Sequence, residues 1–145
     1  MIALLQRVQH ASVEVDKKII GEIKKGILLF IGIEKNDNEE IANRLCQRFL
    51  SYRVFSDEQD KMNLSVKDIN GGVLLIPQFT LAADTRKGCR PSFSSAAAPE
   101  HGHKMFDYVV TQTKQQHDNV EVGKFSADMK VDLLNDGPVT FWLQA

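Results

Sequence analysis

Apolar and polar positions in the first part of the chain follow the pattern of β-strands. Residues 2–8 form a mostly apolar run, and residues 12–16 then alternate between apolar and polar side chains, as a half-buried strand does. Lys17 and Lys18 are predicted to form the tip of a hairpin, with 19–23 as its return strand.

Two continuous apolar runs, 27–33 and 73–76, show no alternation and follow glycines. Strands of this composition are buried on both faces, so both runs are predicted to lie inside a sheet. The second run leads directly into the segment 77–80. After it, 82–99 has the small and charged residues of a long loop.

Two segments have the residue spacing of amphipathic helices. The first is predicted to begin at Asn36 or Asp37, because either residue can cap a helix. Its apolar stripe consists of Ile41, Leu45 and Phe49. The second is predicted over 100–116. Its inner side is marked by Met105, Tyr108, Val109 and Gln112.

Strand-like alternation returns after residue 120. One face of the predicted strand collects Phe125, Ala127, Met129, Val131 and Leu133. Asp136 and Gly137 are predicted to turn the chain, since Asp-Gly is a strong hairpin signal. No repeat, linker or low-complexity segment occurs. The pattern therefore predicts one α+β domain over 1–145, with mostly antiparallel strands and two covering helices.

Composition narrows the functional classes. A net charge of -1 gives no overall attraction to nucleic acid, so an RNA partner would need a local basic patch, and DNA is not expected. Cys46 and Cys89 match neither a disulfide framework nor zinc-ligand spacing, which favours free thiols in a reducing compartment. The first residues lack the basic start of a signal peptide, and no apolar stretch reaches transmembrane length. We expect a cytoplasmic protein without membrane contact.

Three common kinds of site find little support in the sequence. His101 and His103 are spaced i, i+2, which does not place two metal ligands on one helix face, so a solvated helix terminus is favoured. Gly71-Gly72 lacks the glycine spacing and lysine of nucleotide-binding loops. A cysteine nucleophile is not favoured either, because Cys46 lies near the apolar side of a helix and is interpreted as a small core residue. Neither a metal nor a cofactor is predicted.

Gln78-Phe79-Thr80 is unusual because polar residues follow a buried strand, where a chain can present side chains and backbone N–H groups to a cleft. Thr80 is either a nucleophile or proton donor, or simply a β-branched residue at a strand end.

Two further segments allow binding without proving it. A loop carries three cations, which are either solvated or placed to hold phosphates: Arg86, Lys87 and Arg90. In Asn135-Asp136-Gly137-Pro138, glycine permits close backbone approach to another molecule and the proline permits a cis bond.

The chain closely resembles the bacterial D-aminoacyl-tRNA deacylases over its whole length. The matching stretches are Gln6-Arg7-Val8, Ala11-Ser12-Val13, Gln78-Phe79-Thr80-Leu81, Asp84-Thr85, Lys87-Gly88, Arg90-Pro91-Ser92-Phe93 and Gly123 through Leu143. The resemblance implies β-barrel-like subunits that form a homodimer with the active site at the interface. It implies hydrolysis of D-aminoacyl-tRNA and of mischarged glycyl-tRNA, while L-aminoacyl-tRNA is spared.

The resemblance also implies roles for individual residues. A cis Gly137-Pro138 pair would reach into the partner's pocket and exclude L side chains, a selection by exclusion, and Arg7 would hold its conformation. Pro77 and Met129 are expected to support the site or to bind substrate.

An aminoacyl ester needs mainly positioning and oxyanion stabilisation, for which the backbone N–H groups of Phe79 and Thr80 are candidates. The absence of a Ser-His-Asp set favours assistance by the 2′-hydroxyl of the terminal adenosine.

Pro77 departs from the family, which usually has serine before Gln-Phe-Thr-Leu. Proline removes a hydroxyl and a backbone N–H, so this chain cannot use the hydroxyl group of that serine. Two alternatives therefore stay open: a tRNA- or nucleic-acid-binding module that has lost hydrolysis, and an esterase in which Thr80 is the nucleophile.

Overall fold

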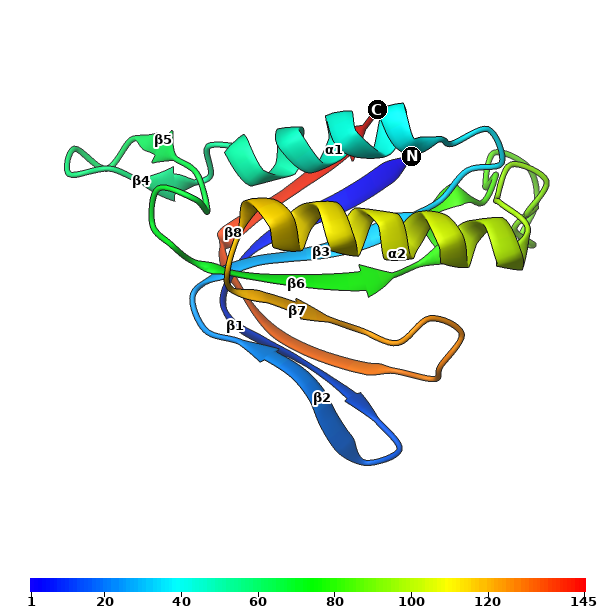
Figure 1. Ribbon diagram of the computed structural model, residues 1–145, viewed down its shortest axis with the longest axis horizontal. Coiled ribbons are helices and arrows are strands. Elements are labelled where there is room, and N and C mark those ends of the chain that lie inside the picture. The colour runs from blue at the N-terminus through cyan, green and yellow to red at the C-terminus, as the bar shows by residue number, and fades with distance from the viewer.

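The computed structural model describes residues 1–145, which form a curved sheet with two helices on one face (Figure 1). The strands are β1 (Ile2–Val15), β2 (Lys18–Ile23), β3 (Gly26–Gly32), β4 (Phe55–Ser56), β5 (Met62–Leu64), β6 (Gly72–Pro77), β7 (Val120–Val122) and β8 (Lys130–Gln144). The helices are α1 (Glu39–Ser51), α2 (Pro99–Gln116) and the short 3-10 helix η1 (Phe79–Ala82).

The main sheet has the strand order β2-β1-β3-β6-β7, and β8 pairs with the other edge of β1. All pairs made by β1 are antiparallel, whereas β3–β6 and β6–β7 are parallel. β2 curls back toward β7, so that a Cβ built at Gly21 would lie 3.4 Å from Glu121 Cβ. The sheet is therefore nearly closed, and the predicted barrel-like α+β domain with two covering helices is confirmed.

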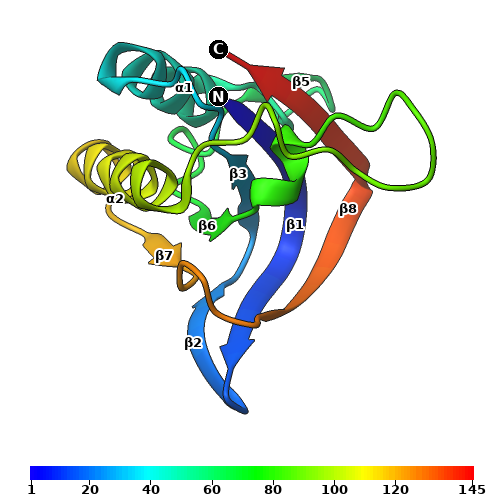
Figure 2. The ribbon, with the colours of Figure 1, turned by 90° about the vertical axis from the view of Figure 1, so that its right-hand side faces the viewer.

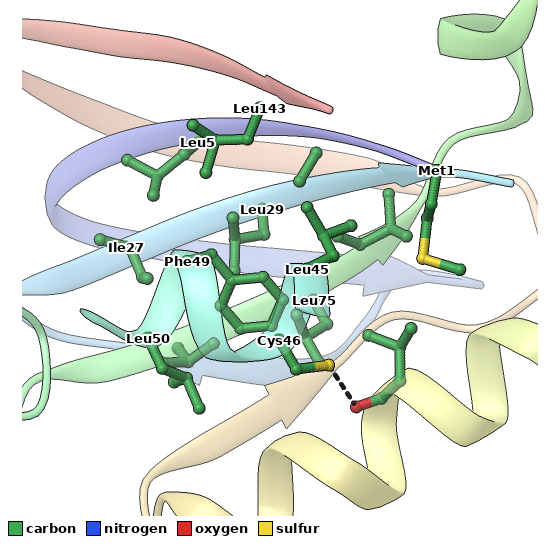
Figure 3. Close-up of a cluster of buried hydrophobic side chains, with 14 of the residues drawn as sticks. Met1, Leu5, Ile27, Leu29, Leu45, Cys46, Phe49, Leu50, Leu75 and Leu143 are labelled. Atoms are coloured by element: carbon green, nitrogen blue, oxygen red, sulfur yellow. Dashed lines mark hydrogen bonds between the residues drawn. The ribbon is translucent and has the colours of Figure 1, made fainter. Parts of the chain in front are cut away.

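The larger hydrophobic core lies between the sheet and the helices (Figure 3). Leu45 and Phe49 of α1 pack there beside Leu29 of β3. Leu28, on the opposite face of β3, packs with Leu74 inside the barrel. β3 is thus buried on both faces, as its unbroken apolar sequence predicted.

Helix α1 begins later than predicted. Asn38 is the cap, and its side chain accepts a hydrogen bond from the Ile41 N–H at 3.0 Å. Asp37 makes other contacts, because its carboxylate accepts hydrogen bonds from the Met1 ammonium group at 2.7 Å and from the Glu34 N–H at 2.7 Å. The buried Asp37 therefore ties the first strand to the segment before α1.

Helix α2 agrees with the prediction to within one residue at its start. Met105 and Val109 face the core as expected, while Tyr108 and Gln112 are only half-buried. The buried Phe106 and Thr113 complete its inner side. No helix of the structure combines the length and apolar character needed to cross a bilayer.

The first hairpin turn differs from the sequence prediction. The first hairpin turns at Asp16-Lys17 rather than Lys17-Lys18, and both residues have positive φ, +50° and +62°. Farther along the chain, β4 begins at Phe55 and pairs with β5.

The C-terminal third departs most from the prediction. The long strand expected from residue 120 is interrupted: β7 ends at Val122, and 123–129 form a turn that carries Phe125 and Met129. The hairpin expected at Asp136-Gly137 is wrong, because β8 runs through it without reversing.

A bulge takes up the extra residues of β8 instead. Gln6 of β1 pairs with Thr140 and Val8 pairs with Asn135, so two steps along β1 correspond to five along β8. The turn-forming residues thus bend a continuous strand away from its partner.

Candidate active site

The turn after β6 holds the predicted catalytic segment. Gln78 extends the ladder between β6 and β3, since its N–H donates to the Ile31 carbonyl at 2.8 Å. η1 then begins at Phe79 and packs closely on the end of β3. A Cβ at Gly32 would come within 2.8 Å of Leu81 Cβ, so any side chain there would displace η1. Close packing therefore fixes the segment at this edge of the sheet.

The hydroxyl group of Thr80 has a single nearby side-chain partner in this turn. Gln78 Nε2 donates a hydrogen bond to Thr80 Oγ1 at 2.6 Å. Because the amide group is the hydrogen-bond donor here, it cannot accept the proton of the Thr80 hydroxyl group. Within this chain, no histidine, carboxylate or amine is hydrogen-bonded to the hydroxyl as the base for a threonine nucleophile would be.

The backbone N–H groups of Phe79 and Thr80 open η1. The first N–H groups of a helix have no acceptor within that helix. Neither group donates in the backbone hydrogen bonds of the turns and loops. Two adjacent donors are therefore available for an oxygen atom that carries developing negative charge.

A largely apolar cavity of about 420 Å³ opens beside this turn. It lies between the end of β6, the beginning of α2 and the 123–129 turn. Pro77 and Met129, both predicted to bind or support substrate, line it together with Phe79. Phe125 and Gly102 also line it. The sequence did not indicate them, because Phe125 matched the alternation of a buried strand.

Arg7 lies against the segment that contains Gly137 and Pro138. Its Nε donates to the Asp136 carbonyl at 3.1 Å, and its second nitrogen donates to the Val54 carbonyl at 2.6 Å. Its side chain is only 14% exposed. The Gly137-Pro138 peptide bond is cis, and both residues are exposed.

Asn135 also stabilises this bulge through its side chain. Its side-chain amide donates to the carbonyls of Arg7 and Val139, at 3.0 Å each. Side chains of β1 and β8 therefore replace the ladder hydrogen bonds that the bulge interrupts.

Within one chain, Gly137-Pro138 and the turn after β6 do not meet. β8 is separated from β6 by β1 and β3, so the two segments belong to strands three steps apart in the sheet. They also lie at different positions along β3. Arg7, which contacts the Gly137 segment, pairs with Ile27 of β3, whereas Gln78 follows the residue that pairs with Ile31. The structure thus divides the predicted residues into two separate groups.

The loop between η1 and α2 projects from one end of the molecule (Figure 2). Arg86, Lys87 and Arg90 lie on it and are exposed. Arg86 forms a two-pronged ion pair with Asp84, at 2.9 and 2.7 Å. Hydrogen bonds from Arg86 hold the pKa of the Asp84 carboxyl well below its usual range. Lys87 and Arg90 have no carboxylate partner.

The remaining candidates have structural contacts. His101 Nε2 lies 2.9 Å from the Asp37 carbonyl, and the His103 ring stacks on Phe125 at 4.7 Å between centroids. Cys46 is fully buried, as predicted, with its sulfur 3.8 Å from the Val109 carbonyl (Figure 3).

Comparison with known proteins gives a consistent result. The model of the family described as D-Tyr-tRNA(Tyr) deacylase matches residues 4–144. Proteins named D-aminoacyl-tRNA deacylase from Klebsiella pneumoniae (strain 342) and Escherichia coli O1:K1 / APEC are each 56% identical over 144 residues, covering 99% of both chains.

Two solved structures have a similar fold over the whole chain. One named c-Myc DNA Unwinding Element Binding Protein is 34% identical with a TM-score of 0.96, and the alignment covers 100% of this chain and 99% of that one. A probable eukaryotic D-amino acid tRNA deacylase has a TM-score of 0.88 at 14% identity, covers 99% of this chain and 98% of its own, and supports the fold alone. The chain belongs to the D-Tyr-tRNA(Tyr) deacylase family and is a hydrolase that acts on an ester bond.

Proposed function

We propose that this enzyme hydrolyses the ester bond of D-aminoacyl-tRNA in the cytoplasm, releasing the free D-amino acid and tRNA. Mischarged glycyl-tRNA is a second substrate, because glycine has no side chain that an exclusion mechanism could reject. The observation that carries the proposal is the pair of unpartnered N–H groups at Phe79 and Thr80, in a turn whose residues Gln78 and Phe79 line an apolar cavity.

The chemistry needs little beyond this arrangement. Water attacks the ester carbonyl carbon, and the negative charge that develops on the carbonyl oxygen is stabilised by the Phe79 and Thr80 N–H groups. The bond to the ribose 3′-oxygen then breaks, and that oxygen takes up a proton. The 2′-hydroxyl of the terminal adenosine assists the proton transfer, which agrees with the absence of a protein base near Thr80.

The cavity beside η1 accommodates the terminal adenosine of the tRNA. Its walls are mainly apolar, and Pro77, Met129 and Phe125 offer contact surfaces for a flat base. Pro77 contributes no hydroxyl, so binding here depends on packing and on the polar groups of Gln78.

Gly137-Pro138 excludes L-aminoacyl groups from the site of a second subunit. Three observations support this proposal of a homodimer. The pair is exposed, Arg7 and Asn135 fix the surrounding backbone, and within one chain the pair is three strands away from η1. A rigid backbone wall rejects a side chain better than a mobile side chain would.

A deacylation assay with D-tyrosyl-tRNA and L-tyrosyl-tRNA tests the function. We expect release of D-tyrosine only. Binding of tRNA without release of D-tyrosine would instead support a nucleic-acid-binding module that has lost hydrolysis. Duplex DNA serves as a competitor, and we expect it not to inhibit, since RNA is the proposed partner.

Replacement of Thr80 separates the two mechanisms. If the backbone N–H groups act, Thr80→Ala keeps substantial activity, and tRNA with a 2′-deoxy terminal adenosine is hydrolysed much more slowly. Abolished turnover in Thr80→Ala, together with an acyl-enzyme detected by mass spectrometry in the unmodified protein, would instead establish a threonine nucleophile.

A further inference from the structure

Two phenylalanine rings lie side by side on the surface next to the proposed site. Phe79 of η1 is 63% exposed, and Phe93 of the following loop is 43% exposed. Their ring centroids are 5.3 Å apart, with an angle of 45° between the ring planes. Exposed aromatic rings that contact each other form an apolar patch, and such patches mark interaction surfaces.

The pair lies between two cavities of opposite character. Phe79 lines the apolar cavity of about 420 Å³. Phe93 directly follows Ser92, which lines a polar cavity of about 440 Å³ together with Arg86 and Lys87. The order along the surface is therefore an apolar cavity, an aromatic pair and a polar groove.

The polar groove is locally basic although the whole chain is not. Within 84–93 the charged groups are Asp84 and three cations, so the segment carries a net charge of about +2 (three minus one), whereas the chain has -1. Arg86 is engaged by Asp84, which leaves Lys87 and Arg90 without a carboxylate partner. These two cations are available to phosphate groups.

We propose that Phe79 and Phe93 form a stacking platform for the unpaired base that precedes the terminal adenosine of the RNA, while Lys87 and Arg90 bind the phosphates of that strand. The inference rests on the proposed function. Aromatic side chains beside a cationic groove are the means by which proteins hold single-stranded nucleic acid, because every base offers a flat face to a ring. The excess positive charge favours a polyanion on the rings and the groove, whereas a second copy of this chain, with a net charge of only -1, gains little attraction from it.

A platform of this kind lets the enzyme distinguish tRNA from a small ester. A substrate that ends at the adenosine fills the apolar cavity alone, whereas tRNA also reaches the rings and the groove. The pair should therefore act on the KM for tRNA, with little effect on kcat. Because stacking tolerates any base, the identity of the stacked base should matter little.

Substitution of Phe93 tests the platform, because Phe93 lies outside the turn that holds the ester. The substrates are D-tyrosyl-tRNA and D-tyrosyl-adenosine, which lacks the preceding nucleotides. Phe93→Leu keeps an apolar side chain without a ring and should raise the KM for D-tyrosyl-tRNA about 5- to 150-fold, the range expected for loss of one stacked base. Turnover of D-tyrosyl-adenosine should stay unchanged, and Phe93→Trp should restore the KM.

A spectroscopic signal reports stacking directly. The probe is an RNA hairpin whose single-stranded 3′ end carries 2-aminopurine next to the terminal adenosine. Its fluorescence should be quenched by the unmodified protein and by Phe93→Trp, and less by Phe93→Leu. Ile19→Ala removes a similarly exposed apolar side chain on β2 and should behave as the unmodified protein.

Several outcomes would overturn the platform. One is equal KM values for D-tyrosyl-tRNA in Phe93→Leu and the unmodified protein, with both substrates still hydrolysed. Another is an equal loss toward both substrates together with altered sedimentation, which would assign the rings to an interface between copies of the chain. If the unmodified protein hydrolyses neither substrate, the proposed function itself fails, and the 2-aminopurine signal alone then decides whether the rings bind RNA.

Discussion

At the scale of single residues, Arg7 joins three segments of the chain. It lies on β1, donates to the Val54 carbonyl before β4 and donates to the Asp136 carbonyl in the β8 bulge. Arg7→Lys keeps the charge, but a single ammonium group has no planar fork to reach both carbonyls at once. We expect the free energy of unfolding to fall by about 1–3 kcal/mol, measured by urea denaturation.

The same substitution should also weaken chiral selection. Without the contact to Asp136, the backbone of Gly137 loses a fixed neighbour, and the rate ratio between D- and L-tyrosyl-tRNA should decrease. Arg48→Lys is a matched control, since Arg48 also donates to a backbone carbonyl, that of Gln144, on an exposed surface. Unchanged selectivity in Arg7→Lys would show that the bulge holds its shape without this side chain.

The two cysteines should react very differently with thiol reagents. Burial raises the pKa of the Cys46 thiol to about 11, so almost no thiolate exists there at pH 8. Cys89 is exposed on the loop. Iodoacetamide at pH 8 should therefore label one cysteine in the native protein and two in urea, counted by mass spectrometry. Rapid native labelling of Cys46 would contradict the packing between α1 and α2.

The sequence could predict burial more readily than the contacts of polar residues. Cys46 and Leu45 were assigned to the core correctly, because helical spacing alone places them on the apolar face. Arg7, in contrast, matches an exposed cation on a strand. Its partners, Val54 and Asp136, lie 47 and 129 positions away, and no local pattern indicates contacts at that separation.

At the scale of elements, the N-terminus of α1 offers a clean test of local structure. Asn38 accepts a hydrogen bond from Ile41 N–H, and its side chain is exposed. Asn38→Ala should therefore lower the free energy of unfolding by about 1 kcal/mol. Asn38→Asp, which can cap the helix in the same way, should have little effect. Asn36→Ala is the control, because the sequence proposed Asn36 as a cap and the structure does not use it.

The wrong prediction of a hairpin within β8 has a non-local cause. Asp-Gly favours a hairpin by its backbone preferences, but the choice between a hairpin and a bulge depends on what the flanking residues pair with. Here both flanks pair with β1, Leu133 with Ala11 and Phe141 with Leu5, so the strand continues through the turn-forming residues. Such pairing joins residues more than 100 positions apart, so it cannot be recognised from the residues around Asp136 alone.

Pro77 shows how an unusual residue can fit a regular element. Along a strand, N–H groups alternate between the two neighbouring strands. Val73 donates to the Asn119 carbonyl next to β7, and Gln78 donates toward β3, so the missing N–H of Pro77 points to the β7 side. The last bond there is from Gly123 to the Leu75 carbonyl. Proline therefore occurs where the ladder has already ended.

At the scale of the whole molecule, the site residues form two groups on different strands. One group, around Phe79, has the donors and the cavity. The other, around Gly137, is exposed and rigidly supported. The family resemblance assigned both to one site, whereas a single chain keeps them apart. If each of two chains placed its Gly137 group in the site of the other, both sites would be completed at once, and the dimer would be symmetric.

Mixing two variants tests this arrangement. Gly137→Val should damage the wall that its own chain supplies to the partner, because a Cβ at Gly137 would meet Arg7 and Val139 within 3 Å. Phe79→Pro removes one donor N–H from the turn. After unfolding and refolding together, one of the two sites in each mixed dimer combines an intact wall with an intact turn. Mixed dimers, separated from both homodimers by an affinity tag on one variant, should then hydrolyse D-tyrosyl-tRNA and spare L-tyrosyl-tRNA, although neither variant alone does both. Mixed dimers whose rates equal the average of the separate variants would show that each chain builds its site alone.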